Sequence, residues 1–399
     1  MLTSKRALRA LAIVAVLGVV GAACAKKATT TSSSGGAKKA VKIAYIGALT
    51  GDYALLVKPG FQAAQLAFDE ANSGKFGNLP VTITLVPEDT QGSPDQAPSV
   101  VDQIVNDQSF VGVIGPAFSG ESQAVGSRLD SSQIPFMTPS ATNPGLAQNG
   151  WTHWFRAVGN DNSQGPVGAN YISQKLTPNC VFVASDGSTY GKGLADVALT
   201  TLKSGGISTQ PEQTVQPGQK DFSALVTKIK ASGCGAVFYG GYSPEAGLLR
   251  KQMTQAGLTS VTLVGGDGIK DDTFLSTAGS AGEGTIATCP CASITDSTDP
   301  AAQAFISDYK AKFGTDPGIY SGEGWDIAKM YIAAFAAKHT TRQSIADFFH
   351  GLSGFKGLTK SYTFQQSGEL DPNAVTIYLY QDKGGQWAYL GPSTTVLTG

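Results

Sequence analysis

Apolar and polar positions switch between two periodicities along most of the chain. Residues 41–47 form a β-branched, apolar run that ends in glycine, which predicts a strand. From Phe61 to Ala71 the apolar residues recur at helical spacing. The same alternation continues with strands expected at 81–86, 110–114 and 134–137, and helices at 97–105 and 122–129. Strands that alternate with helices predict a parallel sheet covered on both faces.

A second series of the same kind follows the polar stretch 160–165. Strands are expected at 180–185, 207–215, 236–239 and 261–264, and helices at 167–175, 193–203, 222–230 and 244–256. Two similar series predict two similar lobes, with 160–165 as a crossing between them.

The last third does not repeat this pattern. Helices are expected at 305–313, 324–338 and 343–351, and strand-like runs only at 361–364 and 374–380. We therefore expect the helices to pack on the first lobe and the final strands to contact the second. The predicted fold is α/β, with two doubly wound parallel-sheet lobes joined by three crossings. Lobe 1 comprises 40–160 and 291–365, and lobe 2 comprises 161–290 and 366–399.

The N-terminal region has the order of a secretory signal. Lys5 and Arg6 precede an apolar run over 10–20, and small residues lead to Cys24. This predicts a signal peptide over 1–23 and a polar, flexible linker over 24–39. The junction resembles the lipobox of bacterial lipoproteins, which would place a lipid on Cys24. It departs at Gly21, where that family more often has a larger aliphatic residue.

The alternative is an exported protein with an incidental cysteine. In both cases the apolar run is shorter than the roughly 20 residues of a membrane span. We expect the mature chain outside the cytoplasm, and the lipobox resemblance implies an anchor on the outer face of the cell membrane.

Composition narrows the possible functions. The net charge is −1, which gives no basic surface for nucleic acid. The chain has no G-x-x-x-x-G-K-[ST] or G-x-S-x-G motif, and its three histidines are scattered. Asp186 and Glu245 could form an acid pair, but they also suit a turn and the first turn of a helix. We therefore expect a monomeric protein that is not an enzyme and that has no cofactor and no metal.

The cysteines beyond Cys24 are even in number, which favours disulfides in an oxidising compartment. Cys180 begins one expected strand and Cys234 nearly begins another. If these strands are parallel neighbours, both thiols lie at the same edge of the sheet, within bridging range. We predict a Cys180–Cys234 disulfide, whereas Cys289 and Cys291 either close a small ring or stay reduced.

Polar side chains gather where the expected strands end, which is where open parallel sheets bind ligands. In the first lobe Ser119 and Ser140–Thr142 precede helices, and helix starts with hydroxyl groups suit an anionic group. In the second lobe Tyr190, Tyr242 and Asp267 offer phenols and a carboxylate, which are partners for an ammonium group. A zwitterion between the lobes would satisfy both.

Simpler interpretations exist for each of these residues. Ser119 and Thr142 could be helix caps, and Asp267 between glycines could form a turn. Tyr190 and Tyr242 could be surface aromatics. Their joint placement at corresponding strand ends of two lobes favours binding.

Several sequence blocks resemble the extracytoplasmic solute-binding proteins for branched-chain amino acids. This leucine/isoleucine/valine-binding group has the type I periplasmic binding fold, and the resemblance covers essentially all of the mature chain. The blocks are 140–144, 161–166, 190–195, 220–225 and 239–245.

This resemblance implies a role for each candidate residue. Ser119 and Thr142 would bind the ligand carboxylate, helped by backbone N–H groups near Ser140 and Ala141. The α-ammonium group would lie among Tyr190, Tyr242 and Asp267.

The chain departs from the group at three positions. Asp267 replaces a glutamate, Leu56 replaces a bulky aromatic wall, and Ser140 replaces a glycine. Tyr53 and Phe118 could fill the space left at Leu56.

The implied mechanism is closure of the lobes on an amino acid, which is then delivered to the membrane permease of an ABC importer. A lobe that senses a ligand for a signalling partner is an alternative. A related amide or aromatic acid as the ligand is another.

Overall fold

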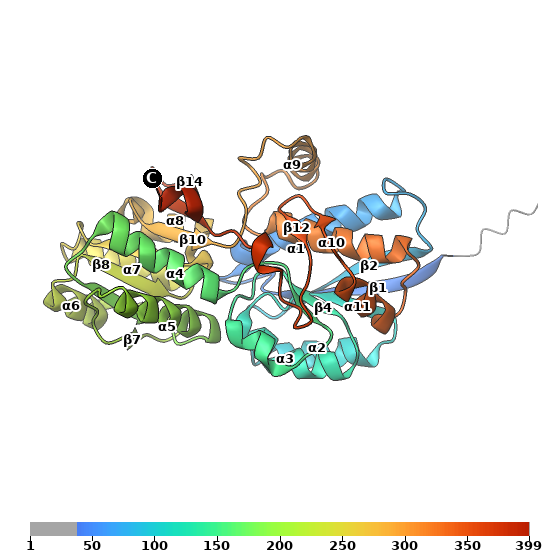
Figure 1. Ribbon diagram of the computed structural model, residues 1–399, viewed down its shortest axis with the longest axis horizontal. Helices are drawn as coiled ribbons and strands as arrows, with labels where there is room; N and C mark the ends of the chain where they lie inside the picture. Colours follow the sequence, from blue (N-terminus) through green and yellow to red (C-terminus); the bar gives the residue numbers. More distant parts are fainter. Residues whose placement is uncertain (1–37, 399) are drawn as a thin grey trace, which may run out of the picture. The chain divides into compact units, whose positions relative to one another are not determined.

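The computed structural model describes residues 38–398, which form two lobes, each built around its own sheet (Figure 1). The expected signal peptide, Cys24 and most of the linker lie outside the described residues. The linker ends earlier than predicted, because Lys39 already begins the first strand. Within residues 38–398 no helix has both the length and the apolar character needed to cross a membrane.

The first lobe is built on a five-stranded parallel sheet with the order β2-β1-β3-β4-β5. Its strands are β1 (Lys39–Gly47), β2 (Val81–Asp89), β3 (Phe110–Ile114), β4 (Phe136–Thr138) and β5 (Trp154–Arg156). Side chains of β1 alternate between two cores, as the pleat requires. Ile43 and Tyr45 join a core with α1, α10 and α11, whereas Ala44 and Ile46 join one with α2 and α3. These helices are α1 (Ala54–Asn72), α2 (Ala97–Asn106), α3 (Ser119–Ser131), α10 (Ser321–Ala336) and α11 (Arg342–His350).

The second lobe has a seven-stranded sheet with the order β14-β13-β10-β9-β8-β6-β7. Its strands are β6 (Val181–Ser185), β7 (Gln213–Thr214), β8 (Ala236–Gly240), β9 (Thr262–Gly265), β10 (Ile286–Cys289), β13 (Tyr378–Asp382) and β14 (Trp387–Pro392). Only β13 and β14 run antiparallel to their neighbours. One face packs on α4 (Asp161–Tyr171) and α5 (Thr189–Ser204). The other packs on α6 (Ser223–Ser232), α7 (Ser243–Gln255) and α8 (Asp272–Ala278).

In each sheet the strand order changes direction between two adjacent strands, β1 and β3 in the first lobe and β6 and β8 in the second. The chain winds outward in opposite directions from β1 and β3 in the first lobe and from β6 and β8 in the second. Such a switch point leaves a crevice beyond the carboxyl ends of the strands. The loops after β1, β3, β6 and β8 therefore occupy the positions where this topology places a ligand.

The C-terminal third contributes to both lobes. Tyr331 of α10 lies with its hydroxyl 3.1 Å from the carbonyl oxygen of Val113 and 3.0 Å from that of Pro135, which attaches this helix to the first sheet. The chain then returns to the second sheet through β13. It passes between the lobes three times, after β5, after β10 and before β13, as predicted. The lobe limits drawn from the sequence stay predictions.

The remaining elements are short or lie at the periphery. They are α9 (Pro300–Phe313), α12 (Ser393–Val396), β11 (Phe355–Lys356), β12 (Ser361–Tyr362), the π-helical turn η2 (Ile172–Leu176) and the 3-10 turns η1 (Pro144–Asn149), η3 (Asp267–Ile269), η4 (Gly279–Gly282) and η5 (Pro372–Ala374).

Several sequence predictions were wrong in extent. Residues 161–165 begin α4 instead of forming an irregular crossing, because the side chain of Asn160 caps that helix by accepting from the Asn162 N–H at 3.1 Å. Of the strand expected at 207–215, only β7 forms. The run at 361–364 pairs with β11 as β12, not with the second sheet. Strands β5, β10 and β14 were not predicted.

Helix α1 begins at Ala54, seven residues before the predicted start. Pro59 and Gly60 lie inside it, although both residues are unfavourable in helix interiors. Packing explains Gly60, since a Cβ there would lie 2.6 Å from the Tyr45 hydroxyl and 3.2 Å from the carbonyl oxygen of Tyr320, which precedes α10. The close approach of α1 and α10 therefore overrides local propensity.

The structure contains the disulfide that the strand ends predict. Cys180 and Cys234 are joined just before β6 and β8, which pair in parallel with Val181 opposite Ala236. Cys289 and Cys291 form a second disulfide that closes a small ring.

We predict that replacing Cys180 and Cys234 together by serine lowers the free energy of unfolding by about 4 kcal/mol. The reason is that this bridge spans 54 residues, and a loop of that length constrains the unfolded chain strongly. Urea denaturation without reductant measures the effect. The matched control replaces Cys289 and Cys291 by serine. That disulfide joins residues with a sequence separation of only 2, so its loss should lower the free energy of unfolding far less. If the variant without Cys180 and Cys234 has a free energy of unfolding within 1 kcal/mol of the wild-type value, the prediction is wrong.

Candidate functional site

A small cavity lies at the carboxyl ends of the central strands of both sheets. Its volume is about 10 Å³, which holds about one water molecule. Its lining comes from both lobes and consists of Leu56, Ala117, Phe118, Ser119, Ser140, Tyr190, Tyr242 and Asp267. A ligand larger than a water molecule can therefore enter only when these walls move apart. The structure brings most of the predicted site residues together here, whereas Tyr53, Ala141 and Thr142 lie outside the lining.

Asp267 is the acceptor at the centre of the second-lobe wall. It follows β9 at the start of η3 and is 3% exposed. The phenol of Tyr190 donates to Asp267 Oδ1 at 3.0 Å and accepts from the Gly268 N–H at 3.0 Å. A Cβ on Gly266 would come within 2.5 Å of the Tyr190 hydroxyl, so the glycines beside Asp267 make room for this ring.

Tyr320 completes the environment of Asp267 and was not predicted from the sequence. Its phenol donates to Asp267 Oδ2 at 2.5 Å, and the residue is 3% exposed. Tyr320 precedes α10, which packs on the first sheet, so the bond joins the two lobes. Tyr320 does not follow a strand: it lies between α9 and α10, so the strand ends in the sequence give no signal for it.

The electrostatics of the cavity are dominated by one buried carboxyl group. Asp267 is the single charged residue in its lining. Burial raises the pKa of Asp267, while the hydrogen bonds from Tyr320 and Tyr190 act in the opposite direction. Arg156 does not compensate, because it bonds to Glu369 and to the carbonyl oxygens of residues 141 and 143. A cationic group is therefore the natural partner of the Asp267 carboxylate.

Ser119 supplies the clearest donor on the first-lobe wall. It is the first residue of α3, is 1% exposed, and its Oγ accepts from the Asn143 N–H at 3.2 Å. Because this bond uses a lone pair, the hydroxyl proton remains available to a ligand. Ser140 donates its own proton to the Ala117 carbonyl oxygen at 2.7 Å.

The other predicted carboxylate donors either donate to protein acceptors or lie outside the cavity lining. The N–H groups of Ser140 and Ala141 donate to Thr138 Oγ1 at 3.4 and 2.9 Å. Thr142 is fully buried, and its Oγ1 has no partner among the described residues. Asp161 is also fully buried with both oxygens unpartnered there, and burial, followed by the charge of Asp267, raises its pKa well above the usual range.

Phe118 and Tyr242, which line the cavity, pack against Tyr53, which lies outside the lining. Tyr53, Phe118 and Tyr242 form a triangle with ring centroids 5.3–5.8 Å apart. Tyr53 also reaches toward the second lobe, with its hydroxyl 3.5 Å from Glu245 Oε1. Leu56 is 5% exposed and lines the cavity together with Phe118. That Tyr53 and Phe118 fill the space left at Leu56 stays a prediction.

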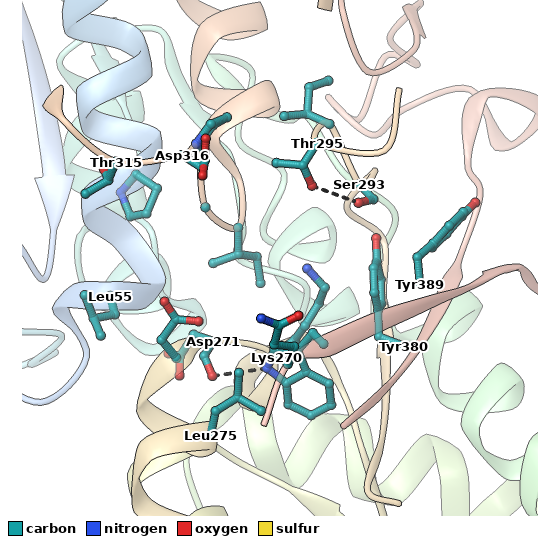
Figure 2. A pocket seen from close by; sticks show the side chains of 18 of the residues that line it. Leu55, Lys270, Asp271, Leu275, Ser293, Thr295, Thr315, Asp316, Tyr380 and Tyr389 are labelled. Atoms are coloured by element: carbon teal, nitrogen blue, oxygen red, sulfur yellow. Dashed lines mark hydrogen bonds between the residues drawn. The ribbon is translucent and has the colours of Figure 1, made fainter. Parts of the chain in front are cut away.

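A wider groove of about 1440 Å³ lies elsewhere between α1, α8, α9 and the strands β13 and β14. Figure 2 shows Lys270 beside Tyr380 in this groove, where the ammonium lies 4.0 Å from the ring centroid. None of the predicted site residues lines it.

Comparison with known proteins agrees with the fold. A family model described as periplasmic binding protein matches residues 40–386. The chain belongs to this family. Its two parallel-sheet lobes have the type I periplasmic binding architecture, as predicted.

Several named relatives are similar over most of this periplasmic binding protein. Leu/Ile/Val-binding protein homolog 3 of Brucella melitensis is 30% identical over 86% of this chain and 92% of its own length. The leucine-, isoleucine-, valine-, threonine- and alanine-binding protein of Pseudomonas aeruginosa is 30% identical over 85% and 89%. The structure of LivJ from Streptococcus pneumoniae in complex with isoleucine has a TM-score of 0.80 at 26% identity, over 89% of this chain and all of LivJ.

The carboxyl group of Glu121 gives a testable pH dependence near the site. Glu121 lies in the first turn of α3, accepts from the Phe118 N–H and from Thr90, and is fully buried. Burial raises its pKa from 4.5 to about 7. The folded state therefore holds this proton more tightly than the unfolded state, so the stabilisation is complete below pH 4.5 and is lost as the pH rises through 7.

We predict that Glu121→Gln reduces the loss of stability between pH 5 and pH 8 by up to about 3 kcal/mol relative to wild type. Urea denaturation at both pH values measures this difference. The exposed Glu283→Gln serves as the control and should follow wild type. Equal pH slopes for Glu121→Gln and wild type would contradict the assignment.

Proposed function

We propose that this chain captures an amino acid between its two lobes outside the cytoplasm and delivers it to the permease of an ABC importer. The observation that carries the proposal is the polarity of the cavity. One wall presents the buried carboxylate of Asp267, and the other presents the Ser119 hydroxyl with its proton free. An α-ammonium and an α-carboxylate group satisfy these two walls at once.

The names of the relatives support a branched-chain amino acid as the ligand. The two similar curated proteins are named for binding leucine, isoleucine and valine, and LivJ contains isoleucine. The apolar walls of Leu56, Phe118 and Tyr242 suit an aliphatic side chain. A sensing lobe and an amide or aromatic acid ligand find no support in these relatives.

Binding is coupled to closure of the lobes in this mechanism. An open form admits the amino acid, and closure then excludes water and brings both walls onto it. Charge-assisted hydrogen bonds contribute about 1.5–3 kcal/mol each. A few of them reach roughly −8 kcal/mol after the ordering costs, which corresponds to a micromolar dissociation constant.

The place of action follows from the family. Periplasmic binding proteins act outside the cytoplasm, which agrees with the signal expected before Cys24. Cys24 carries the lipid anchor in this proposal. The closed form then docks on a membrane permease, which an anchored protein reaches without diffusing away.

A thermal-shift screen over the twenty amino acids tests the function directly. A ligand at 100 times its dissociation constant adds about 2.7 kcal/mol to the free energy of unfolding. We expect L-leucine, L-isoleucine or L-valine to raise the melting temperature. No shift with any amino acid would contradict the proposal.

We predict that Asp267→Asn weakens binding of L-leucine by tenfold or more without unfolding the chain. The amide keeps the shape of Asp267 but removes the charge that faces the ammonium group. Isothermal titration calorimetry measures the affinity, and the exposed Asp95→Asn is the matched control. Unchanged affinity in Asp267→Asn would refute the ammonium role of this residue.

A further inference from the structure

Tyr320 has an unusual backbone for a residue with a large side chain. Its φ is +59° and its ψ is 6°, in the left-handed region that favours glycine. Its carbonyl oxygen accepts from the Gly324 N–H at 2.9 Å and lies close to α1, where a Cβ on Gly60 would be 3.2 Å away. The start of α10 therefore holds Tyr320 in a conformation that an unconstrained chain would avoid, and such positions often serve a binding site.

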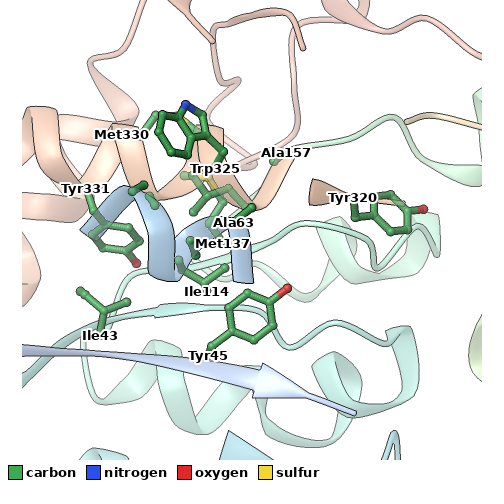
Figure 3. Close-up of a cluster of buried hydrophobic side chains, with 14 of the residues drawn as sticks. Ile43, Tyr45, Ala63, Ile114, Met137, Ala157, Tyr320, Trp325, Met330 and Tyr331 are labelled. Atoms are coloured by element: carbon green, nitrogen blue, oxygen red, sulfur yellow. The ribbon is translucent and has the colours of Figure 1, made fainter. Parts of the chain in front are cut away.

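This conformation directs the phenol toward the second lobe. Figure 3 shows the Tyr320 hydroxyl pointing away from the other labelled side chains of the first-lobe core, including Trp325 and Met330. Its partner is Asp267 Oδ2, whereas Tyr190 takes Oδ1. The carboxylate thus receives one phenol from each lobe.

The remaining hydrogen-bonding capacity at this point consists only of acceptors. Each phenol has a single proton, and both protons are used on Asp267. The Tyr190 oxygen also accepts from the Gly268 N–H, but no described residue donates to the Tyr320 oxygen. Gln164 is a further hydrogen-bond partner of Asp267. The Tyr320 oxygen and the lone pairs of Asp267 that these donors leave are therefore free to accept.

An ammonium group matches this arrangement because it has three donors and no acceptor. We propose that Tyr320 is a specificity-determining residue whose phenol oxygen, together with Asp267, receives the α-ammonium group of the ligand. This inference rests on the proposed function and extends it. It assigns part of the ammonium subsite to the first lobe, so that closure completes the subsite.

The Tyr320 phenol and the Asp267 carboxylate lie 2.5 Å apart across the two lobes, so they form one group of acceptors. A hydroxyl or hydrogen at the α-carbon of the ligand would leave these acceptors with fewer donors.

The test compares L-leucine with its α-hydroxy analogue, 2-hydroxy-4-methylpentanoate, by isothermal titration calorimetry. We expect Tyr320→Phe to reduce the preference for L-leucine over the hydroxy acid by tenfold or more, because only the amine loses an acceptor. The isosteric variant should melt close to wild type without ligand. Tyr309→Phe removes another first-lobe phenol, bonded to Gln62 at 2.8 Å, and should keep the wild-type preference.

Two results would overturn the inference. One is a wild-type affinity for L-leucine in Tyr320→Phe. The other is an equal loss for both ligands, which would show that Tyr320 acts only on closure or packing. Failure of the proposed function would appear in the wild-type chain itself, as an absence of L-leucine binding, and is therefore distinguished from failure of this inference.

Discussion

The buried carboxylate of Asp267 is the constraint on which the site depends. A carboxylate removed from water is costly unless donors surround it. Here Tyr190 and Tyr320 supply those donors from opposite lobes, and no lysine or arginine lines the cavity. The two phenols hold the carboxylate in place without neutralising it, so a cationic group of a ligand would be stabilised there.

The fold supplies the positions that this constraint needs. Both sheets reverse their strand order between the first and third strands of each lobe, which opens the crevice where Asp267, Ser119 and Tyr190 meet. The glycines beside Asp267 admit the Tyr190 ring, and Gly60 and Gly324 allow α1 and α10 to approach so closely that Tyr320 reaches across. Local packing and the ligand site are thus determined by the same residues.

Much of this arrangement could be predicted from the sequence, because parallel strands place their following residues at one edge. Ser119, Tyr190, Tyr242 and Asp267 all follow strands, and the Cys180–Cys234 bridge follows from the same reasoning at the opposite edge. Tyr320 could not be found in this way, since it precedes α10 and reaches Asp267 only through the tertiary fold. The engagement of the Ser140 and Ala141 N–H groups by Thr138 likewise depends on a side-chain rotamer that no periodicity encodes.

If opposite lobes hold opposite ends of one amino acid, a crystal structure of the complex with L-leucine will show it. We expect the ligand nitrogen within hydrogen-bonding distance of Asp267 and the ligand carboxylate on the Ser119 hydroxyl. A ligand in the reverse orientation, or one held by a single lobe with Asp267 facing only the two phenols, would contradict this expectation.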